Sequence, residues 1–136
     1  VGRSEYAALR EELRQRLLEV RDPATGMRAV RNVYLREEVV NGPLLEFAPD
    51  LYVGYEPGYR VSWESVGGAV PARSVFEDNE TLWSGEHMSD APTVPGVFLC
   101  NKPARMLSPR VIDVAPTVLD CLGIPAPGEM DGQPIL

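Results

Sequence analysis

"MRAVRNVYLREEVV", residues 27–40, is the stretch that predicts a sheet in this chain. It is rich in β-branched and aromatic residues, which favour a strand, and we expect one over about residues 28–35. Glu37 and Glu38 follow it as neighbouring carboxylates. Neighbours on a strand point to opposite faces, so we expect a solvated strand end there rather than a paired acid site.

The residues before this strand predict an amphipathic helix over 4–21. Its apolar positions recur at three- and four-residue spacing: Leu9, Leu13, Leu17 and Val20. Such spacing places them on one helix face. We expect Ser4 to cap the N-terminus, and Pro23 to stop the helix because the residue before a proline avoids helical backbone angles. The arginines alternate with glutamates, which indicates a solvated face rather than a basic patch.

After the first strand the sequence predicts two more, at 51–55 and 59–63, separated by turn residues at 56–58. From about 64 to 95 the chain contains Gly, Pro and acidic residues and has no sustained periodicity. We expect a long irregular loop at 64–95. A loop of that length in a compact domain is usually either disordered or functional.

Two more elements are predicted after the loop. GVFLC, residues 96–100, is a short continuous apolar run, typical of a strand buried on both faces. A helix is expected from Asp113, with Pro116 in its first turn and Gly123 as its C-terminal stop. Its apolar face consists of Val114, Val118, Cys121 and Leu122.

Together these elements predict an α/β fold with a mixed sheet flanked by helices. Because only one strand is of the doubly buried type, we expect residues 1–136 to form a single partial domain that completes a larger sheet. Cys100 and Cys121 lie in apolar contexts, and we expect small buried residues there rather than a disulfide.

Composition narrows the function classes. The chain has 136 residues, 44% of them hydrophobic and 24% charged, which suits one globular domain of ordinary size. The formal net charge of -7 argues against a nucleic-acid partner, since no basic stripe is available to neutralise phosphates. No run is long enough for a membrane span, and no charged-then-apolar leader opens the chain, so we expect a soluble, cytoplasmic protein.

The only histidine, His87, lies in TLWSGEHMSD, residues 81–90, which we call the histidine loop. By its spacing alone, a lone loop histidine is most often a surface or hydrogen-bonded residue. The nearby carboxylates are Asp78, Glu80, Glu86 and Asp90. Zinc sites prefer more nitrogen or sulfur than this set offers, so the chain cannot build a standard zinc site unaided.

Other catalytic motifs are weaker. Ser84 and Ser89 flank the histidine, but nothing resembles the strained Gly-x-Ser-x-Gly turn that presents a nucleophilic serine. The glycine-rich patterns that cradle nucleotide phosphates are also absent from the sequence.

Three stretches carry a resemblance when taken together: EEVVNGPLLEFAPDLYV (37–53), WSGEHMSDAPTVPGVFLCN (83–101) and VIDVAPTVLDCLGIPAPGEMDGQPIL (111–136). In this order they resemble three segments of type I phosphodiesterase/nucleotide pyrophosphatase-like enzymes of the alkaline phosphatase superfamily. Those segments are the one before the final active-site loop, the Gly-x-His loop with its following strand, and the closing helix and tail. The likeness covers nearly the whole chain from about residue 9.

The resemblance implies a fold and a chemistry. The fold would be the C-terminal segment of an alkaline phosphatase-like domain. In that superfamily two metal ions clamp an in-line displacement at phosphorus. His87 matches the late histidine ligand, which would contribute to the metal that does not hold the nucleophile. The ions would be zinc or manganese. Trp83, beside the loop, is a candidate for lining the substrate pocket, whereas Asp113 is better explained as a helix N-cap than as a ligand.

The family's remaining ligands and its Thr or Ser nucleophile have no counterpart here. The resemblance therefore implies the C-terminal portion of a metal-dependent phosphoesterase acting on phosphate esters or nucleotide-like diesters. Alone, the chain should be inactive and bind no metal tightly. It would need the missing N-terminal portion, from the same polypeptide or a separate chain. We also expect an exposed apolar patch and a tendency to self-associate.

Two alternatives remain open at this point. One is a non-catalytic binding or structural module derived from this fold. The other is a related chemistry of the superfamily, phosphonate hydrolysis or phosphotransfer.

Overall fold

The computed structural model describes residues 2–69, 74–83, 85 and 89–136. The chain forms two compact units, Val1–Pro95 and Gly96–Leu136, which we call the N-terminal and C-terminal units. The expectation of a single partial domain stays a prediction. No helix of the described residues is long and apolar enough to cross a membrane.

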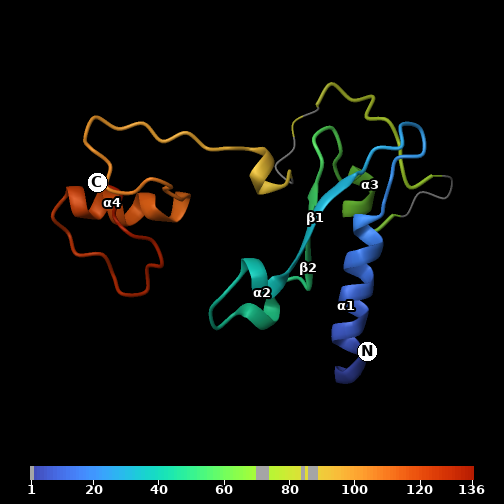
Figure 1. The fold of residues 1–136 in the computed structure, drawn as a ribbon, viewed down its shortest axis with the longest axis horizontal. Helices are drawn as coiled ribbons and strands as arrows, with labels where there is room; N and C mark the ends of the chain where they lie inside the picture. Colours follow the sequence, from blue (N-terminus) through green and yellow to red (C-terminus); the bar gives the residue numbers. More distant parts are fainter. Residues whose placement is uncertain (1, 70–73, 84, 86–88) are drawn as a thin grey trace. The chain divides into compact units, whose positions relative to one another are not determined.

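The N-terminal unit holds most of the regular structure (Figure 1). Its elements are α1 (Arg3–Leu18), β1 (Val30–Leu35), α2 (Arg36–Val39), the 3₁₀ helix η1 (Leu45–Phe47), β2 (Leu51–Tyr55), α3 (Trp63–Val66) and the 3₁₀ helix η2 (Ala91–Thr93). The predicted first helix is confirmed, but its cap is Gly2 rather than Ser4, and it ends at Leu18, before the expected end at residue 21. The Glu5 carboxylate reaches back to accept a hydrogen bond from the Gly2 N–H at 3.1 Å, so the helix begins before Ser4.

β1 and β2 form a two-stranded antiparallel sheet in which Asn32 pairs with Gly54 and Tyr34 with Tyr52. The strands expected at 28–35 and 51–55 are therefore confirmed, and the fold is a small mixture of helices and sheet. The described residues contain no mixed sheet; β1 and β2 run antiparallel. The strand expected at 59–63 is wrong, because Ser62 caps α3 by accepting from the Glu64 N–H at 3.3 Å.

The core of the N-terminal unit lies where α1 packs against β1, and its buried apolar residues are Ala29, Val30 and Val33. The predicted apolar face of α1 is only partly right, because Leu9 and Leu13 are 38% and 43% exposed.

Salt bridges join α1 to α2. The Arg10 guanidinium donates two hydrogen bonds to Glu37, at 2.7 and 2.9 Å, and Arg14 donates one to Glu38 at 3.2 Å. The two glutamates thus belong to a helix rather than to a strand end, and they neutralise arginines that we expected to be solvated.

The irregular loop expected at 64–95 is confirmed for the described residues. Apart from α3 and η2, they have no helix or strand in this range. One backbone bridge ties the range to the sheet, because Ser89 pairs in parallel with Tyr55 at the end of β2.

The C-terminal unit contains the 3₁₀ helix η3 (Val111–Asp113) and α4 (Val114–Cys121). The predicted helix and its stop are confirmed. Gly123 has φ 70°, and the N–H groups of Gly123 and Ile124 donate to the carbonyls of Asp120 and Leu119 at 3.0 and 2.9 Å. This pair of bonds is the Schellman motif that glycine permits at a helix end.

The strand expected at 96–100 is wrong. These residues have no regular structure and are exposed. A doubly buried strand needs partners on both edges and cover on both faces, and the described residues supply neither. Cys100 and Cys121 are free as expected but exposed, so their predicted burial is wrong. The predicted apolar face of α4 is also uncovered, with Val118 51% and Leu122 67% exposed.

Candidate functional site

The histidine loop is described only in part. His87 lies outside the described residues, as do Ser84 and Glu86. The described residues of the loop are 81–83, 85, 89 and 90. They form a first limb ending at Trp83 and a second limb at Ser89 and Asp90.

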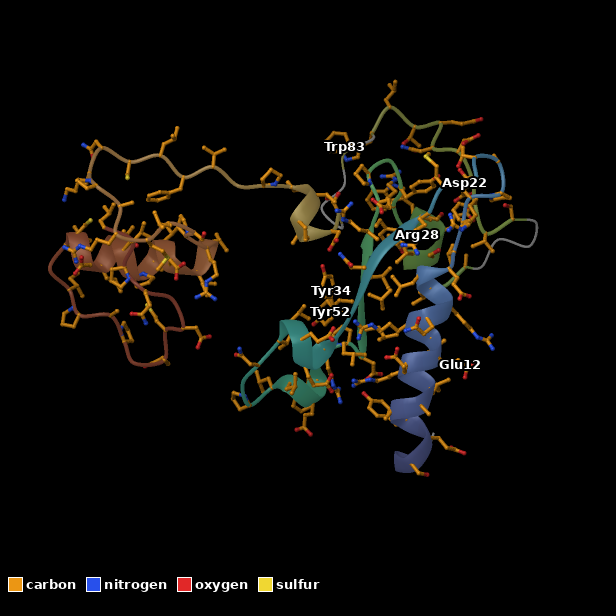
Figure 2. The ribbon with its side chains drawn as sticks, viewed as in Figure 1. Glu12, Asp22, Arg28, Tyr34, Tyr52 and Trp83 are labelled. Atoms are coloured by element: carbon orange, nitrogen blue, oxygen red, sulfur yellow. The ribbon has the colours of Figure 1, made fainter. Side chains whose placement is uncertain are left out.

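The first limb is a short turn held by Asn79. Its side-chain oxygen accepts hydrogen bonds from the Thr81 N–H at 3.2 Å and the Thr81 hydroxyl at 2.7 Å, while its amide donates to the Trp83 carbonyl at 3.2 Å. Trp83 is 73% exposed (Figure 2). Its indole is thus open to a ligand, and its assignment to a substrate pocket stays a prediction.

The second limb is held by a buried carboxylate. Asp90 is 2% exposed. One of its oxygens accepts a hydrogen bond from the Tyr34 hydroxyl at 2.8 Å, and the other accepts one from the Asn32 side-chain amide at 2.6 Å. The Arg31 Nε lies 3.6 Å from the second oxygen. A buried carboxylate is stable only when its charge and lone pairs are satisfied in this way.

The sheet explains why these residues meet. Asn32 and Tyr34 are two apart on β1, so their side chains lie on the same face. Gly54, the cross-strand partner of Asn32, belongs to that face too. A Cβ at residue 54 would lie 2.6 Å from an oxygen of Asp90, closer than real Cβ contacts come. The missing side chain of Gly54 therefore makes the space that Asp90 fills.

Asp90 also starts the next turn of the chain. Its backbone carbonyl accepts hydrogen bonds from the Thr93 N–H at 2.8 Å and the Thr93 hydroxyl at 2.6 Å, which begins η2. The hydrogen bond to Asp90 is the main cause that raises the pKa of the Tyr34 hydroxyl above its ordinary value, and desolvation adds to it. The tyrosine is thus held in its neutral, donating form.

Asp90 was one of the carboxylates near His87 in the sequence. In the structure both of its oxygens already accept hydrogen bonds, which gives it a role in holding the loop. Among the residues that the structure describes, no three or more His, Cys, Asp or Glu side chains are grouped to hold a metal ion. The described residues by themselves therefore do not make a metal site.

Asp113 is the buried carboxylate of the C-terminal unit, with 0% exposure. α4 begins directly after it, but its side chain makes no cap bond to that helix. Instead it accepts from the Gln133 N–H at 3.0 Å and the Arg110 N–H at 2.7 Å, and these two bonds, in that order, lower the pKa of the carboxyl. The predicted N-cap is right in position and wrong in its bonding.

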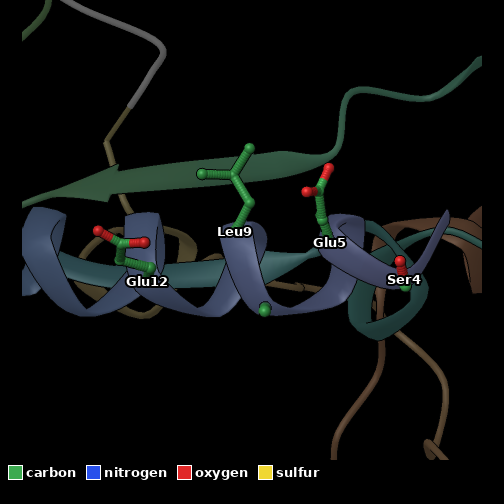
Figure 3. A pocket seen from close by; sticks show the side chains of 5 residues that line it. Ser4, Glu5, Leu9 and Glu12 are labelled. Atoms are coloured by element: carbon green, nitrogen blue, oxygen red, sulfur yellow. The ribbon is translucent and has the colours of Figure 1, made fainter. Parts of the chain in front are cut away.

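Two surface hollows lie elsewhere. One runs along α1, where Glu5, Leu9 and Glu12 extend from one side of the helix (Figure 3). The other is lined by Met27, Arg28, Glu56, Pro57 and Tyr59. Neither contains a residue of the histidine loop, so neither adds to this site.

The residues that sequence reasoning missed are Asn32, Tyr34 and Gly54. A glycine inside a strand often marks the close approach of another segment, and that signal was present in LYVGY. Nothing in the sequence named Asp90 as the approaching residue, because its partners lie 56 and 58 residues earlier.

Comparisons of the chain with protein-family models, with curated proteins and with solved structures found no match. What the chain does must therefore be inferred from its own residues.

Proposed function

We propose that this chain is the C-terminal portion of a metal-dependent phosphoesterase that hydrolyses phosphate esters or nucleotide-like diesters. His87 would supply one metal ligand, and the N-terminal portion would supply the nucleophile and the other ligands. The proposal starts from the three stretches of sequence that resemble this class of enzyme, in the same order.

The structural observation that supports it most is the burial of Asp90 on the sheet. A loop that carries a metal ligand has to be held in one position, since a displacement of about 1 Å weakens metal binding and catalysis. The second limb of the histidine loop is held by two side-chain hydrogen bonds and a backbone bridge.

The bound ions would be two divalent cations, zinc or manganese, whose chemistry would be to polarise the phosphoryl group and stabilise the attacking and leaving oxygens. The imidazole of His87 would hold one of them. The exposed indole of Trp83 offers a flat apolar face to an aromatic group of the substrate.

A second candidate, a non-catalytic binding module, is favoured by a different observation. The C-terminal unit exposes large apolar side chains, among them Val97 at 85%, Leu99 at 87% and Leu107 at 100%. Surfaces of this kind often mark interaction sites. The coding sequence upstream of residue 1 separates the two candidates: the enzyme requires a Thr or Ser nucleophile and Asp-His ligands there.

The direct test is hydrolysis of bis-p-nitrophenyl phosphate by the complete polypeptide in Zn²⁺ or Mn²⁺. We expect His87→Ala to lower kcat/KM at least about 100-fold, since even residues that only orient a metal ligand cost 10- to 100-fold. Asn41→Ala, an exposed substitution in the same unit, is the control and should leave the rate unchanged. Residues 1–136 alone should show no turnover. Full activity of His87→Ala would contradict the proposal.

A further inference from the structure

We propose that Asp90 is the positioning residue of the histidine loop, acting through Asn32 and Tyr34 on β1 and through the space left by Gly54 on β2. Its effect on metal binding rests on the proposed function of His87. Its effect on the loop does not, because that follows from contacts of the described residues.

The two hydrogen bonds fix the orientation of the Asp90 carboxylate. They come from side chains two residues apart on one strand, and each uses a different carboxylate oxygen, at 2.8 and 2.6 Å. A carboxylate bound at both oxygens cannot turn about its own axis without losing one bond. Hydrogen bonds to a charged group are also stronger than neutral ones. The side chain is thus held at two points on a rigid strand.

Gly54 fixes the depth at which Asp90 sits. A Cβ there would come within 2.6 Å of a carboxylate oxygen and 2.7 Å of the Asp90 Cβ and Cγ. A single methyl group on β2 would therefore lift Asp90 away from the sheet without altering any charge or hydrogen-bonding group. This gives a steric test that is independent of the chemical one.

His87, the proposed ligand, is close to Asp90 in the sequence. Three peptide units separate Asp90 from His87, and three units span at most about 11 Å. On the other side of Asp90, its carbonyl accepts two hydrogen bonds from Thr93, so the chain that follows Asp90 is held to it as well. A displacement of Asp90 therefore moves one end of the short segment of chain that joins it to His87.

The first experiment asks whether Asp90 holds the loop, and it uses residues 1–136. Gly54→Ala, Asp90→Asn and Tyr34→Phe are compared by hydrogen exchange of the backbone amides at 89–91, 93 and 94. We expect exchange at least about 10-fold faster in Gly54→Ala, the loss of roughly one hydrogen bond's protection, with β1 amides unchanged. Gly128→Ala is the matched control, since a Cβ there meets nothing within 4 Å. Unchanged exchange in all three variants would overturn the proposal.

A spectroscopic signature separates the Tyr34 bond from general loosening. Tyrosinate absorbance followed to high pH reports the five tyrosines of the chain. Because the Asp90 carboxylate raises the pKa of Tyr34, Asp90→Asn should bring one tyrosine back toward its ordinary value near 10. Tyr34→Phe should remove that transition altogether. If Gly54→Ala does not fold, Tyr34→Phe still tests the anchor because it deletes only one hydroxyl.

The second experiment measures Zn²⁺ affinity of the complete polypeptide. We expect Gly54→Ala and Asp90→Asn to weaken binding roughly 10- to 100-fold, as does loss of residues that orient a metal ligand. If His87→Ala abolishes binding while both variants bind normally, the role of Asp90 is refuted and the proposed function stands. If His87→Ala binds Zn²⁺ normally, the proposed function fails, and with it the effect of Asp90 on metal binding.

Discussion

Among the residues that the structure describes, each unit contains one buried carboxylate, and the two carboxylates accept hydrogen bonds from different kinds of donor. Asp90 in the N-terminal unit, 2% exposed, accepts hydrogen bonds from side chains 56 and 58 residues earlier. Asp113 in the C-terminal unit, 0% exposed, accepts them from backbone N–H groups of Arg110 and Gln133, 3 and 20 residues away. The first carboxylate joins a distant loop to a sheet, whereas the second joins a helix start to the chain's own tail.

The two units also differ in how many apolar side chains they bury. The N-terminal unit buries Ala29, Val30 and Val33, whereas the buried apolar side chains of the C-terminal unit, among the described residues, are Pro116 and Ile135. In the N-terminal unit a carboxylate adds to a core that exists without it. In the C-terminal unit, hydrogen bonds to Asp113 hold the tail to the start of α4, and the apolar face of α4 is exposed. The comparison predicts that the two units will respond differently to small changes.

The largest expected effect is in the C-terminal unit. A Cβ at Gly132 would lie 2.1 Å from the Ile112 carbonyl oxygen and 2.7 Å from its carbon, and backbone atoms cannot turn aside as a side chain can. We expect Gly132→Ala to release the tail and unfold this unit. In ¹H–¹⁵N spectra the dispersed signals of 111–136 should collapse while those of β1 and β2 persist.

Gly128→Ala is the control for that change, because it adds the same methyl group in the same tail with open space around it. Its spectrum should match that of the unsubstituted chain. A dispersed spectrum for Gly132→Ala would show that the tail does not pack against η3, and the contrast between the units would fail.

The second effect is a measurable loss of stability in the N-terminal unit. Asp90→Ala leaves the part-buried Tyr34 hydroxyl and Asn32 amide without their partner, and an unsatisfied group of this kind costs at the lower end of about 1–3 kcal/mol. We expect a loss of about 2 kcal/mol in the free energy of unfolding, against about 1 kcal/mol for Tyr34→Phe. Urea unfolding followed by tryptophan fluorescence measures both. Equal losses would mean that the carboxylate charge and its second bond contribute nothing.

Local signals in the sequence were enough to predict the elements whose structure depends mainly on neighbouring residues. Periodicity gave α1, β-branched and aromatic residues gave β1 and β2, and Gly123 gave the end of α4. Where a distant or missing partner decides the structure, local signals failed. GVFLC has the composition of a buried strand, but no described strand pairs with it. The strand predicted at 59–63 does not form because Ser62 caps the helix α3, which begins at Trp63.

The candidate site divides in the same way. The sequence pointed to the histidine loop through its resemblance to the Gly-x-His loop of a phosphoesterase family, since the lone histidine by itself indicated only a surface residue. The sequence did not identify Asp90 as the residue that holds this loop. The burial of Asp90 depends on which face of β1 and β2 is uncovered and on Gly54, 36 positions earlier. Composition does not contain that information, and only the register of β1 against β2 supplies it.

The third effect concerns the uncovered surface of the C-terminal unit. Val97 and Leu99 are 85% and 87% exposed, and we expect concentration-dependent association of residues 1–136 through this surface. The double variant Val97→Glu/Leu99→Glu should weaken association at least about 10-fold, since burying one such side chain is worth roughly 1.5–3 kcal/mol. Val75→Glu, an equally exposed position in the N-terminal unit, is the control. Sedimentation that shows a monomer at all concentrations would rule out this surface as a site of self-association.

The smallest effect is a dependence on acid pH, and it belongs to the N-terminal unit. Hydrogen bonds from Arg10 are the main cause that lowers the pKa of Glu37 to about 2. A carboxyl whose folded pKa lies below its unfolded value stabilises the fold above the unfolded value, near 4.3, and loses that contribution as the pH falls toward 2. The Glu37 side chain is 45% exposed, so solvent screens the pair and the effect on unfolding is small.

Glu37→Gln should flatten the pH dependence of urea unfolding between about pH 4.3 and 2. Glu46→Gln is the control and should leave it unchanged, because the Glu46 carboxylate joins no ion pair in the described part of the chain. An unchanged slope in Glu37→Gln would mean that the Arg10–Glu37 pair contributes nothing to stability in solution, leaving Arg14–Glu38 as the ion pair between α1 and α2 in the described residues.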